Sequence, residues 1–322
     1  MPRSEDRAAS EVIGAVIIFG FLIIAFTIYQ GVVIPQQNKA IEFDHNEDAQ
    51  DAIQELRNAI RQTATTAAEE SVSITLGASY PPRVLGINPG ASAGSIQTES
   101  LPPISIRNVK RYDPETADYF GRTTTTLGSF QTKAVIYRPI YFQYSNSPDT
   151  LYENSLAYNQ FPGGANLTIT NQAVIDDRKI TLIAIDGNVS EARQGTVSID
   201  TKALSTASNT VSITNDSGPI NITFGTRLTA EDWNETLQGE LTANGGHVTD
   251  VRQTGPNQVS IILQQGITYD LRLAKVGVGD DTSPRTRSTS STPRAMTPAS
   301  SRTARRSWWS RYATGSTTRS AT

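Results

Sequence analysis

The sequence predicts an α+β protein in which a long N-terminal helix, first membrane-spanning and then amphipathic, precedes a mainly antiparallel β-sandwich and a disordered C-terminal tail. Three observations lead to this prediction: an uncharged apolar run, a change of periodicity near residue 70, and the loss of core-forming residue types near residue 282. The expected organisation is a leader at 1–8, an N-terminal helix at 9–69, a β-rich domain at 70–280 and a low-complexity tail at 281–322.

The apolar run extends from Val12 to Ile34 and contains no charged residue. At about 1.5 Å per residue a helix of this run measures roughly 34 Å, enough to cross a hydrocarbon core of about 30 Å. A cleaved secretory signal would have an apolar core of only about 7–15 residues before a small-residue site, so this run is expected to stay in the mature protein. Because Arg3 and Arg7 precede it, we expect a single-pass protein of the cell membrane with a cytoplasmic N-terminus and an extracellular β-domain.

The residues before the run, MPRSEDRA, form a charged leader that ends in a charged and a small residue. With the following Ala-Ser-Glu, this leader resembles the class III signal of archaeal type IV pilins and archaellins. In that family a prepilin peptidase cuts before the apolar helix, which is kept. The resemblance implies a cleavage site formed by Arg7, Ala8 and Ala9, with Ala9 as the mature N-terminus. It also makes Glu11 a candidate subunit contact, although Glu11 would be the third mature residue and bacterial pilins carry their acidic residue at the fifth. A plain membrane anchor is the alternative interpretation of the run.

Residues 36–69 are rich in helix formers, and apolar residues recur there at steps of three and four. The stripe consists of Ile41, Ala49, Ile53, Leu56 and Ile60. We therefore expect an amphipathic stalk whose other face carries Glu42, Asp44, Glu47, Asp48, Asp51 and Glu55. Pro35 stands where the helix would leave the bilayer, so it either kinks one long helix or begins a second one.

From Ser71 the apolar residues alternate with serine and threonine, which is the period of a strand. Further strands are expected at 104–109, 134–144, 166–175, 179–186, 195–199, 209–213, 219–224, 247–253, 257–264 and 267–276. So many short strands with few helices predict a sandwich. One helix is expected at Ala230–Leu241, with Thr229 as its N-cap and Asp232 completing a capping box.

Tyrosines are concentrated between Tyr137 and Phe161, in YRPIYFQYSNSPDTLYENSLAYNQF. They predict either ordinary packing between strands or an exposed adhesive patch. Together with NQAVIDDRKITLIAIDGNVS and TYDLRLAKVGVG, this segment resembles halophilic-archaeal pilin-like surface proteins of undefined function.

The composition bounds the environment and the partners of the chain. It contains no cysteine, so the exported domain cannot rest on disulfides. Residues 1–280 carry 20 basic and 30 acidic side chains, and this acidic balance argues against nucleic-acid binding. The tail reverses the charge with eight arginines and contains no Ile, Leu, Val or Phe after residue 282, so it cannot build a core. Either a Ser/Thr-rich stalk or an out-of-frame translation explains such a tail.

Motifs that carry enzyme chemistry are weak in this sequence. Gly90-Ala-Ser92-Ala-Gly94 matches a nucleophile elbow, but Asn88-Pro89 stands where a strand should lead into the serine. The acidic cluster 44–48 has Ala49 where a calcium loop requires glycine, and a solvated helix face is the better explanation. We expect no catalytic site, no metal and no cofactor.

Five N-glycosylation sequons lie in the predicted exterior, at Asn166, Asn188, Asn215, Asn221 and Asn234. The function that this sequence favours is that of a type IV pilin-like surface protein, a major or minor filament subunit with an adhesive role. Its expected partners are the prepilin peptidase, the membrane and identical or related pilin subunits. The alternative is a membrane-anchored extracellular binding module that does not polymerise.

Overall fold

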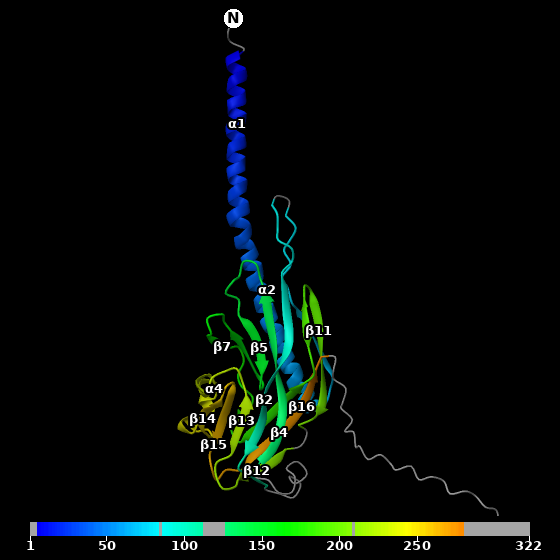
Figure 1. Cartoon of the computed structure of the whole chain (residues 1–322), viewed down its shortest axis with the longest axis vertical. Helices are drawn as coiled ribbons and strands as arrows, with labels where there is room; N and C mark the ends of the chain where they lie inside the picture. Colours follow the sequence, from blue (N-terminus) through cyan, green and yellow to red (C-terminus); the bar gives the residue numbers. More distant parts are fainter. Residues whose placement is uncertain (1–4, 84–85, 112–125, 208–209, 280–322) are drawn as a thin grey trace, which may run out of the picture. The chain divides into compact units, whose positions relative to one another are not determined.

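A computed structural model describes residues 5–83, 86–111, 126–207 and 210–279 of the 322-residue chain. Three helical elements follow one another without a break and form one long helix: α1 (Glu5–Ile28), the π-helical turn η1 (Tyr29–Val33) and α2 (Ile34–Thr66). Figure 1 shows α1 continuing beyond the strands, while α2 runs along them. The predicted N-terminal helix is confirmed, and the predicted tail lies outside the described residues.

The π-helical turn explains how the helix accepts Pro35. Proline lacks an N–H group, and its ring clashes with the carbonyl four residues earlier in a regular α-helix. Here the Ile34 N–H donates to the carbonyl of Tyr29, five residues back, so the backbone widens just before the proline. Pro35 then occupies the first turn of α2. Of the two expected outcomes, a second helix that begins at the proline is not seen: one helix continues through Pro35, with its backbone locally widened just before it.

The strands form two sheets in the described part of the chain. The seven-stranded sheet has the order β1-β11-β16-β12-β3, with β9 beside β16 and β8 beside β9. Its strands are β1 (Glu70–Thr75), β3 (Val109–Arg111), β8 (Ile175–Asp176), β9 (Lys179–Asp186), β11 (Thr196–Ser205), β12 (Val211–Asn215) and β16 (Tyr269–Val278). All its pairings are antiparallel except that of β9 with β16, which is parallel.

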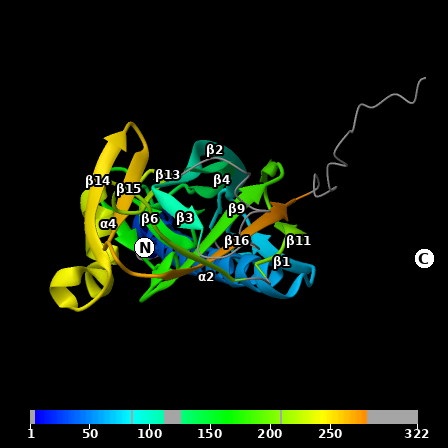
Figure 2. The ribbon, with the colours of Figure 1, turned by 90° about the horizontal axis from the view of Figure 1, so that it is seen from below.

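The nine-stranded sheet is antiparallel throughout and has the order β14-β15-β13-β2-β4-β5-β6-β7, with β10 also paired to β2. Its strands are β2 (Ala93–Arg107), β4 (Thr126–Ile140), β5 (Asp149–Glu153), β6 (Leu156–Gln160), β7 (Asn166–Thr168), β10 (Ser190–Arg193), β13 (Asn221–Gly225), β14 (Val248–Gly255) and β15 (Gln258–Leu263). Figure 2, seen from below, shows α2 lying against the strands of this two-sheet domain. The predicted fold class is thereby confirmed.

Helix α2 packs against both sheets. It contacts β1, β11 and β16 of one sheet and β5 and β6 of the other. Its apolar stripe is fully buried from Ala49 to Ala64 and shares a core cluster with Tyr137 and Tyr152. A second cluster fills the space between the sheets and includes Phe224 and Trp233.

Helix α4 (Ala230–Thr236) confirms the predicted start of a helix. The Thr229 hydroxyl accepts from the Asp232 N–H at 3.1 Å, and the Asp232 carboxylate accepts from the Thr229 N–H at 2.8 Å. Trp233 and Leu237 are fully buried, as the helical spacing requires. The helix is shorter than predicted, because two 3₁₀ turns, η3 (Gln238–Glu240) and η4 (Thr242–Asn244), follow it.

Several strand predictions were wrong, and a local polar contact explains one of them. The predicted strand 166–175 is mostly a loop, because the Gln172 side chain accepts from the N–H groups of Val174 and Ile175. The hairpin β5–β6 was missed because its turn, Asn154-Ser155, lacks glycine although both residues have positive φ. The Pro102-Pro103 pair lies within β2, at an irregularity of its pairing with β4 between Leu101 and Ile104.

Candidate membrane and assembly interface

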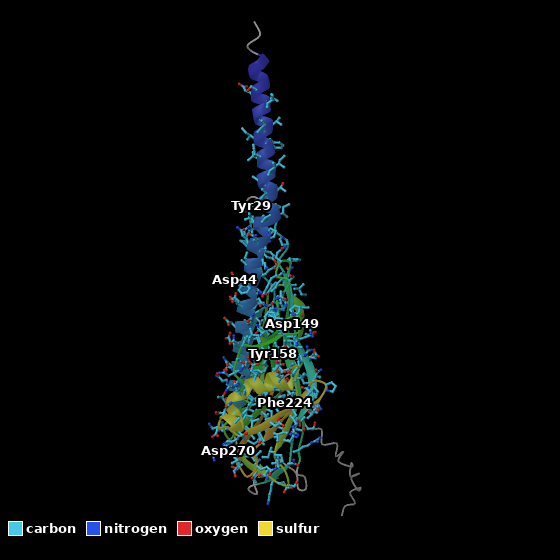
Figure 3. The ribbon with its side chains drawn as sticks, turned by 90° about the vertical axis from the view of Figure 1, so that its left-hand side faces the viewer. Tyr29, Asp44, Asp149, Tyr158, Phe224 and Asp270 are labelled. Carbon is cyan, nitrogen blue, oxygen red and sulfur yellow. The ribbon has the colours of Figure 1, made fainter. Side chains whose placement is uncertain are left out.

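Helix α1 presents an apolar surface that nothing in the described chain covers. Its twelve large apolar side chains between Val12 and Ile28 are 48–69% exposed. Figure 3 shows side chains above Tyr29 projecting freely around the helix. The helix is long enough and apolar enough to cross a membrane. An exposed patch of this size marks contact with a membrane or with another protein.

The predicted cleavage residues lie at the start of this helix. Helix α1 begins at Glu5, so the backbone of Arg7, Ala8 and Ala9 is helical. Glu11 follows as an exposed residue, immediately before the apolar surface. The first four leader residues lie outside the described chain.

The loop that joins β1 to β2, here called the 77–92 loop, contacts the helix just below α1 through its described residues, 77–83 and 86–92. The Ile87 N–H donates to Oε1 of Gln30 at 3.0 Å, and Nε2 of Gln30 donates to the Ile87 carbonyl at 2.8 Å. Gly86, at φ +125°, packs so closely that an added Cβ would lie 2.4 Å from Cδ1 of Ile34. Only glycine fits this position. The loop is the cyan segment that rises beside the helix in Figure 1.

The same loop supplies Arg83, whose guanidinium binds only neutral side chains among the described residues. It donates to Gln37, to Oδ1 of Asn38 at 2.8 Å and to Oδ1 of Asn88 at 2.7 Å. Beside it an apolar groove of about 800 Å³ is lined by Leu22, Ala25, Phe26, Tyr29, Pro81, Pro82 and Arg83. The groove therefore joins the exposed helix to a cation of the β-domain.

Glu42 corrects the predicted stalk. The sequence placed it on the solvated face, but its side chain is fully buried. Its carboxylate accepts from the backbone N–H groups of Phe142, Gln143 and Tyr144 at 2.6–2.9 Å and from the Tyr80 hydroxyl. The carboxylate thus fixes the corner after β4 and also explains why the predicted strand 134–144 ends at Ile140. Asp44, Glu47, Asp48, Asp51 and Glu55 are exposed, as expected.

The tyrosine-rich segment packs the tyrosines of its strands into the core and leaves apolar side chains partly exposed at the corner after β4. Tyr137, Tyr152 and Tyr158 are fully buried in the strands β4, β5 and β6. The corner after β4 instead forms an aromatic cluster against α2, in which Tyr144 meets Phe43 edge to face and stacks on Tyr141. Around it Phe43, Phe142 and Ile140 are 45–56% exposed. We define these three side chains as the aromatic corner.

Burial shifts the pKa values of several titratable groups, among them His45 and Glu153. Burial lowers the pKa of His45 from its usual 6.5, while the nearby Asp48 opposes the shift. The Nδ1 atom of His45 lies 2.7 Å from the Tyr141 hydroxyl, so the neutral ring belongs to the contact between α2 and the corner. Burial raises the pKa of Glu153, although its carboxylate accepts from the Thr226 hydroxyl at 2.6 Å and the Arg227 N–H at 2.9 Å.

The five sequons differ in accessibility. Asn188, in the turn between β9 and β10, and Asn234, within α4, are exposed. The other three are half-buried and hydrogen-bonded: Asn166 donates to Asp232, Asn215 accepts from the Gly266 N–H, and Asn221 accepts from Thr223. An oligosaccharide needs an accessible amide, so geometry favours Asn188, which also lies outside any helix.

The elbow-like serine has a structural contact. Ser92 is fully buried, and its hydroxyl accepts from the Ala78 N–H at 2.7 Å, which ties the two ends of the 77–92 loop. Within the ranges that the structure describes, no three His, Asp or Glu side chains gather as a metal would require.

Sequence reasoning missed the buried Glu42 and the contact of the loop with the helix. A signal for the first was present, because Asn38, Glu42 and Asn46 continue the apolar stripe at steps of four, and all three are buried. The loop left no periodic signal. Between Ser79 and Asn88 it contains one tyrosine, two prolines, three aliphatic residues, one glycine and one charged residue.

Comparison with known proteins gives one relative. Over 186 residues, or 58% of this chain, the sequence is 26% identical to an uncharacterized protein of Archaeoglobus fulgidus. The match spans 30% of that protein's length. No protein-family profile and no solved structure match the chain.

Proposed function

We propose that this chain is a type IV pilin-like protein of the cell surface, held in the membrane by α1 until α1 packs with equivalent helices in a filament. One observation carries the proposal. A single uninterrupted helix has one half built into a β-domain and the other half apolar and uncovered.

The energetics make an apolar partner for α1 obligatory. Fully burying one large apolar side chain contributes about 1.5–3 kcal/mol, so the twelve side chains of α1, each about half exposed or more, amount to on the order of 10–20 kcal/mol. Water cannot be the environment of this surface. Lipid satisfies it before assembly, and neighbouring copies of α1 satisfy it afterwards. Gly14 and Gly20 have open space around their Cα atoms, so another helix can approach closely there.

Maturation follows from the leader. A prepilin peptidase removes residues 1–8, Ala9 becomes the N-terminus, and Glu11 near the new end contacts a neighbouring subunit. Arg3 and Arg7 keep the N-terminus cytoplasmic and the β-domain outside the cell, where Asn188 is accessible for glycosylation.

Processing is tested by the mass and N-terminal sequence of the membrane-derived protein. We expect a start at Ala9, and we expect Ala8→Trp to retain the leader. Ser4→Trp is the matched control, since it adds the same bulk away from the cut. A mature protein that starts at Met1, or one that starts beyond Gly31, contradicts the proposal.

Assembly is tested by shearing combined with disulfide cross-linking. The chain contains no cysteine, so only the introduced cysteine can form a disulfide. Ile17→Cys lies on the uncovered face of α1, and Ser217→Cys lies on an exposed turn of the β-domain. After oxidation, sheared detergent-free fractions should contain large assemblies with disulfide-linked dimers of the first variant and markedly fewer of the second. Recovery only as a detergent-dependent monomer rejects the subunit role.

The aromatic corner supports a second candidate, an anchored extracellular binding module that does not polymerise. Exposed aromatic side chains on a rigid corner suit recognition or adhesion. This module would stay with the membrane on shearing and leave it only with detergent or after proteolysis near residue 70.

A further inference from the structure

We infer that the 77–92 loop is a membrane-contact element, and that the groove between it and α1 seats an anionic phospholipid of the surrounding bilayer. This inference rests on the membrane-held state of the proposed function. It adds a specific lipid contact and sets the depth at which the helix enters the bilayer.

The contact with Gln30 sets that depth. The loop is bound to Gln30 by two hydrogen bonds, and Ile34, inside the apolar run, is 2% exposed because the β-domain already covers it. The hydrocarbon core must therefore end near Tyr29. The stretch from Val12 to Tyr29 then measures about 27 Å as a helix, close to the thickness of the core.

This depth explains why the most exposed large apolar side chain of the described chain is not in contact with water. Ile87 is 78% exposed, more than any large apolar side chain of α1. It stands beside Gln30, and the exposed Pro81 and Pro82 belong to the same loop. An isoleucine here enters the boundary between acyl chains and headgroups, where Tyr29 is also a favoured residue.

The groove complements both parts of an anionic phospholipid, with an apolar wall for an acyl chain and a cation for the headgroup. Leu22, Ala25 and Phe26 give it an apolar wall that continues the membrane-facing surface of α1. Arg83 lies at the other end, with three guanidinium donors on neutral amides and no carboxylate within 4 Å among the described residues. Arg83 binds near Gln37 and Asn38, about 10 Å beyond Gln30 along the helix, and so lies on the headgroup side of the hydrocarbon boundary. A second copy of the chain would have to supply both an apolar segment and an anion, whereas one anionic lipid supplies both.

The test places an environment-sensitive fluorophore on single cysteines in the full mature chain, one copy per lipid nanodisc. Ile87→Cys reports the loop, Phe21→Cys reports the middle of the span, and Ser217→Cys reports the exposed β-domain. Lipids spin-labelled near the headgroup or deep in the acyl chain then quench the fluorophores by depth. We expect shallow labels to quench best at Ile87, deep labels to quench best at Phe21, and neither to quench at Ser217.

A second measurement reads the headgroup. In discs of equal phosphatidylglycerol and phosphatidylcholine, brominated phosphatidylglycerol should quench the Ile87→Cys probe more than brominated phosphatidylcholine. Adding Arg83→Gln should lower that preference about fivefold, the factor that one cation near an anionic bilayer supplies. Arg252→Gln, on an exposed strand, is the matched control and should leave it unchanged.

The outcomes separate this inference from the proposed function. No quenching at Phe21 would overturn the membrane-held state itself. Quenching at Phe21 without quenching at Ile87 overturns the inference alone. So does an unchanged lipid preference in Arg83→Gln. Disulfide-linked dimers of Ile87→Cys in vesicles, with no quenching in single-copy discs, would assign the groove to a second copy.

Discussion

Helices α1 and α2 are two halves of one helix with opposite surfaces. In α2 a stripe from Ile34 to Ala64 is buried against both sheets, and charged residues cover the remainder. In α1 every large apolar side chain is about half exposed or more, and no charge interrupts residues 12–28. Backbone hydrogen bonding is the same in both halves. The comparison teaches that helix formation and burial are separate requirements: α2 meets the second within the chain, and α1 must meet it outside.

The largest expected effect tests whether the β-domain depends on α2 and not on α1. Leu56→Ala removes a fully buried side chain and should lower the free energy of unfolding by about 2–5 kcal/mol. Ile17→Ala, the matched change on α1, should leave it unchanged. Urea unfolding in a mild detergent, followed by circular dichroism, measures both. Equal losses would mean that α1 also packs on the β-domain.

The next effect concerns the buried acid of α2. Glu42→Gln replaces one accepting oxygen with an amide NH₂ group that faces backbone N–H donors, so we expect a loss of about 2–3 kcal/mol. Glu47→Gln removes an exposed charge on the same helix and is the control. The same unfolding experiment applies. A neutral result for Glu42→Gln would show that water or a rearranged corner satisfies the three amides.

A smaller effect is a pH dependence of the free energy of unfolding, which we expect from α2 and not from α1. Burial lowers the pKa of His45, so the folded state favours the neutral ring. Its contribution to stability is present above pH 6.5 and is lost as the pH falls toward the folded pKa. His45→Gln should flatten the pH dependence of unfolding in that window. His247→Gln is the control, and an unchanged slope in His45→Gln would contradict the assignment.

The smallest effect on stability is the most informative about α1. Gly20 has no atom within 4 Å of an added Cβ, so Gly20→Leu should change the free energy of unfolding by less than about 0.5 kcal/mol. If α1 packs closely in a filament, the same substitution should nevertheless reduce the yield of sheared assemblies. Ile28→Leu, which keeps the volume, is the control. Wild-type yields from Gly20→Leu would exclude close helix packing at this glycine.

Periodicity made most of the fold predictable. Each face of a regular helix or strand has a single environment, which the sequence repeats at a fixed period in the apolar run, in the stripe of α2 and in β1. The bounds of β9 were predicted to the residue. Prediction failed where a distant side chain decides the local backbone. The corner after β4 follows from Glu42, one hundred residues earlier. No local pattern encodes such contacts.

Of the candidate interface, only the apolar helix α1 was predictable from the sequence, and the contact of the 77–92 loop with the helix was not. Hydropathy along 12–34 indicates a membrane span without any knowledge of the fold. The lower boundary of the uncovered surface is set by the contact of Gln30 with Ile87, which requires the β1–β2 loop to reach the helix. Sequence spacing cannot place residues 57 positions apart beside each other.

The position of β16 has a consequence for the order in which the chain acquires its structure. It is the last described strand, yet it pairs with β9, β11 and β12 and so lies inside its sheet. The seven-stranded sheet cannot close until residue 278 has left the ribosome. Helix α1 is synthesised first and can enter the bilayer early, while α2 waits for partners from the far end of the chain. Under the proposed function, biogenesis thus runs as early insertion of α1 followed by late folding of the β-domain, with an interval in which the unpaired strands depend on protection from aggregation.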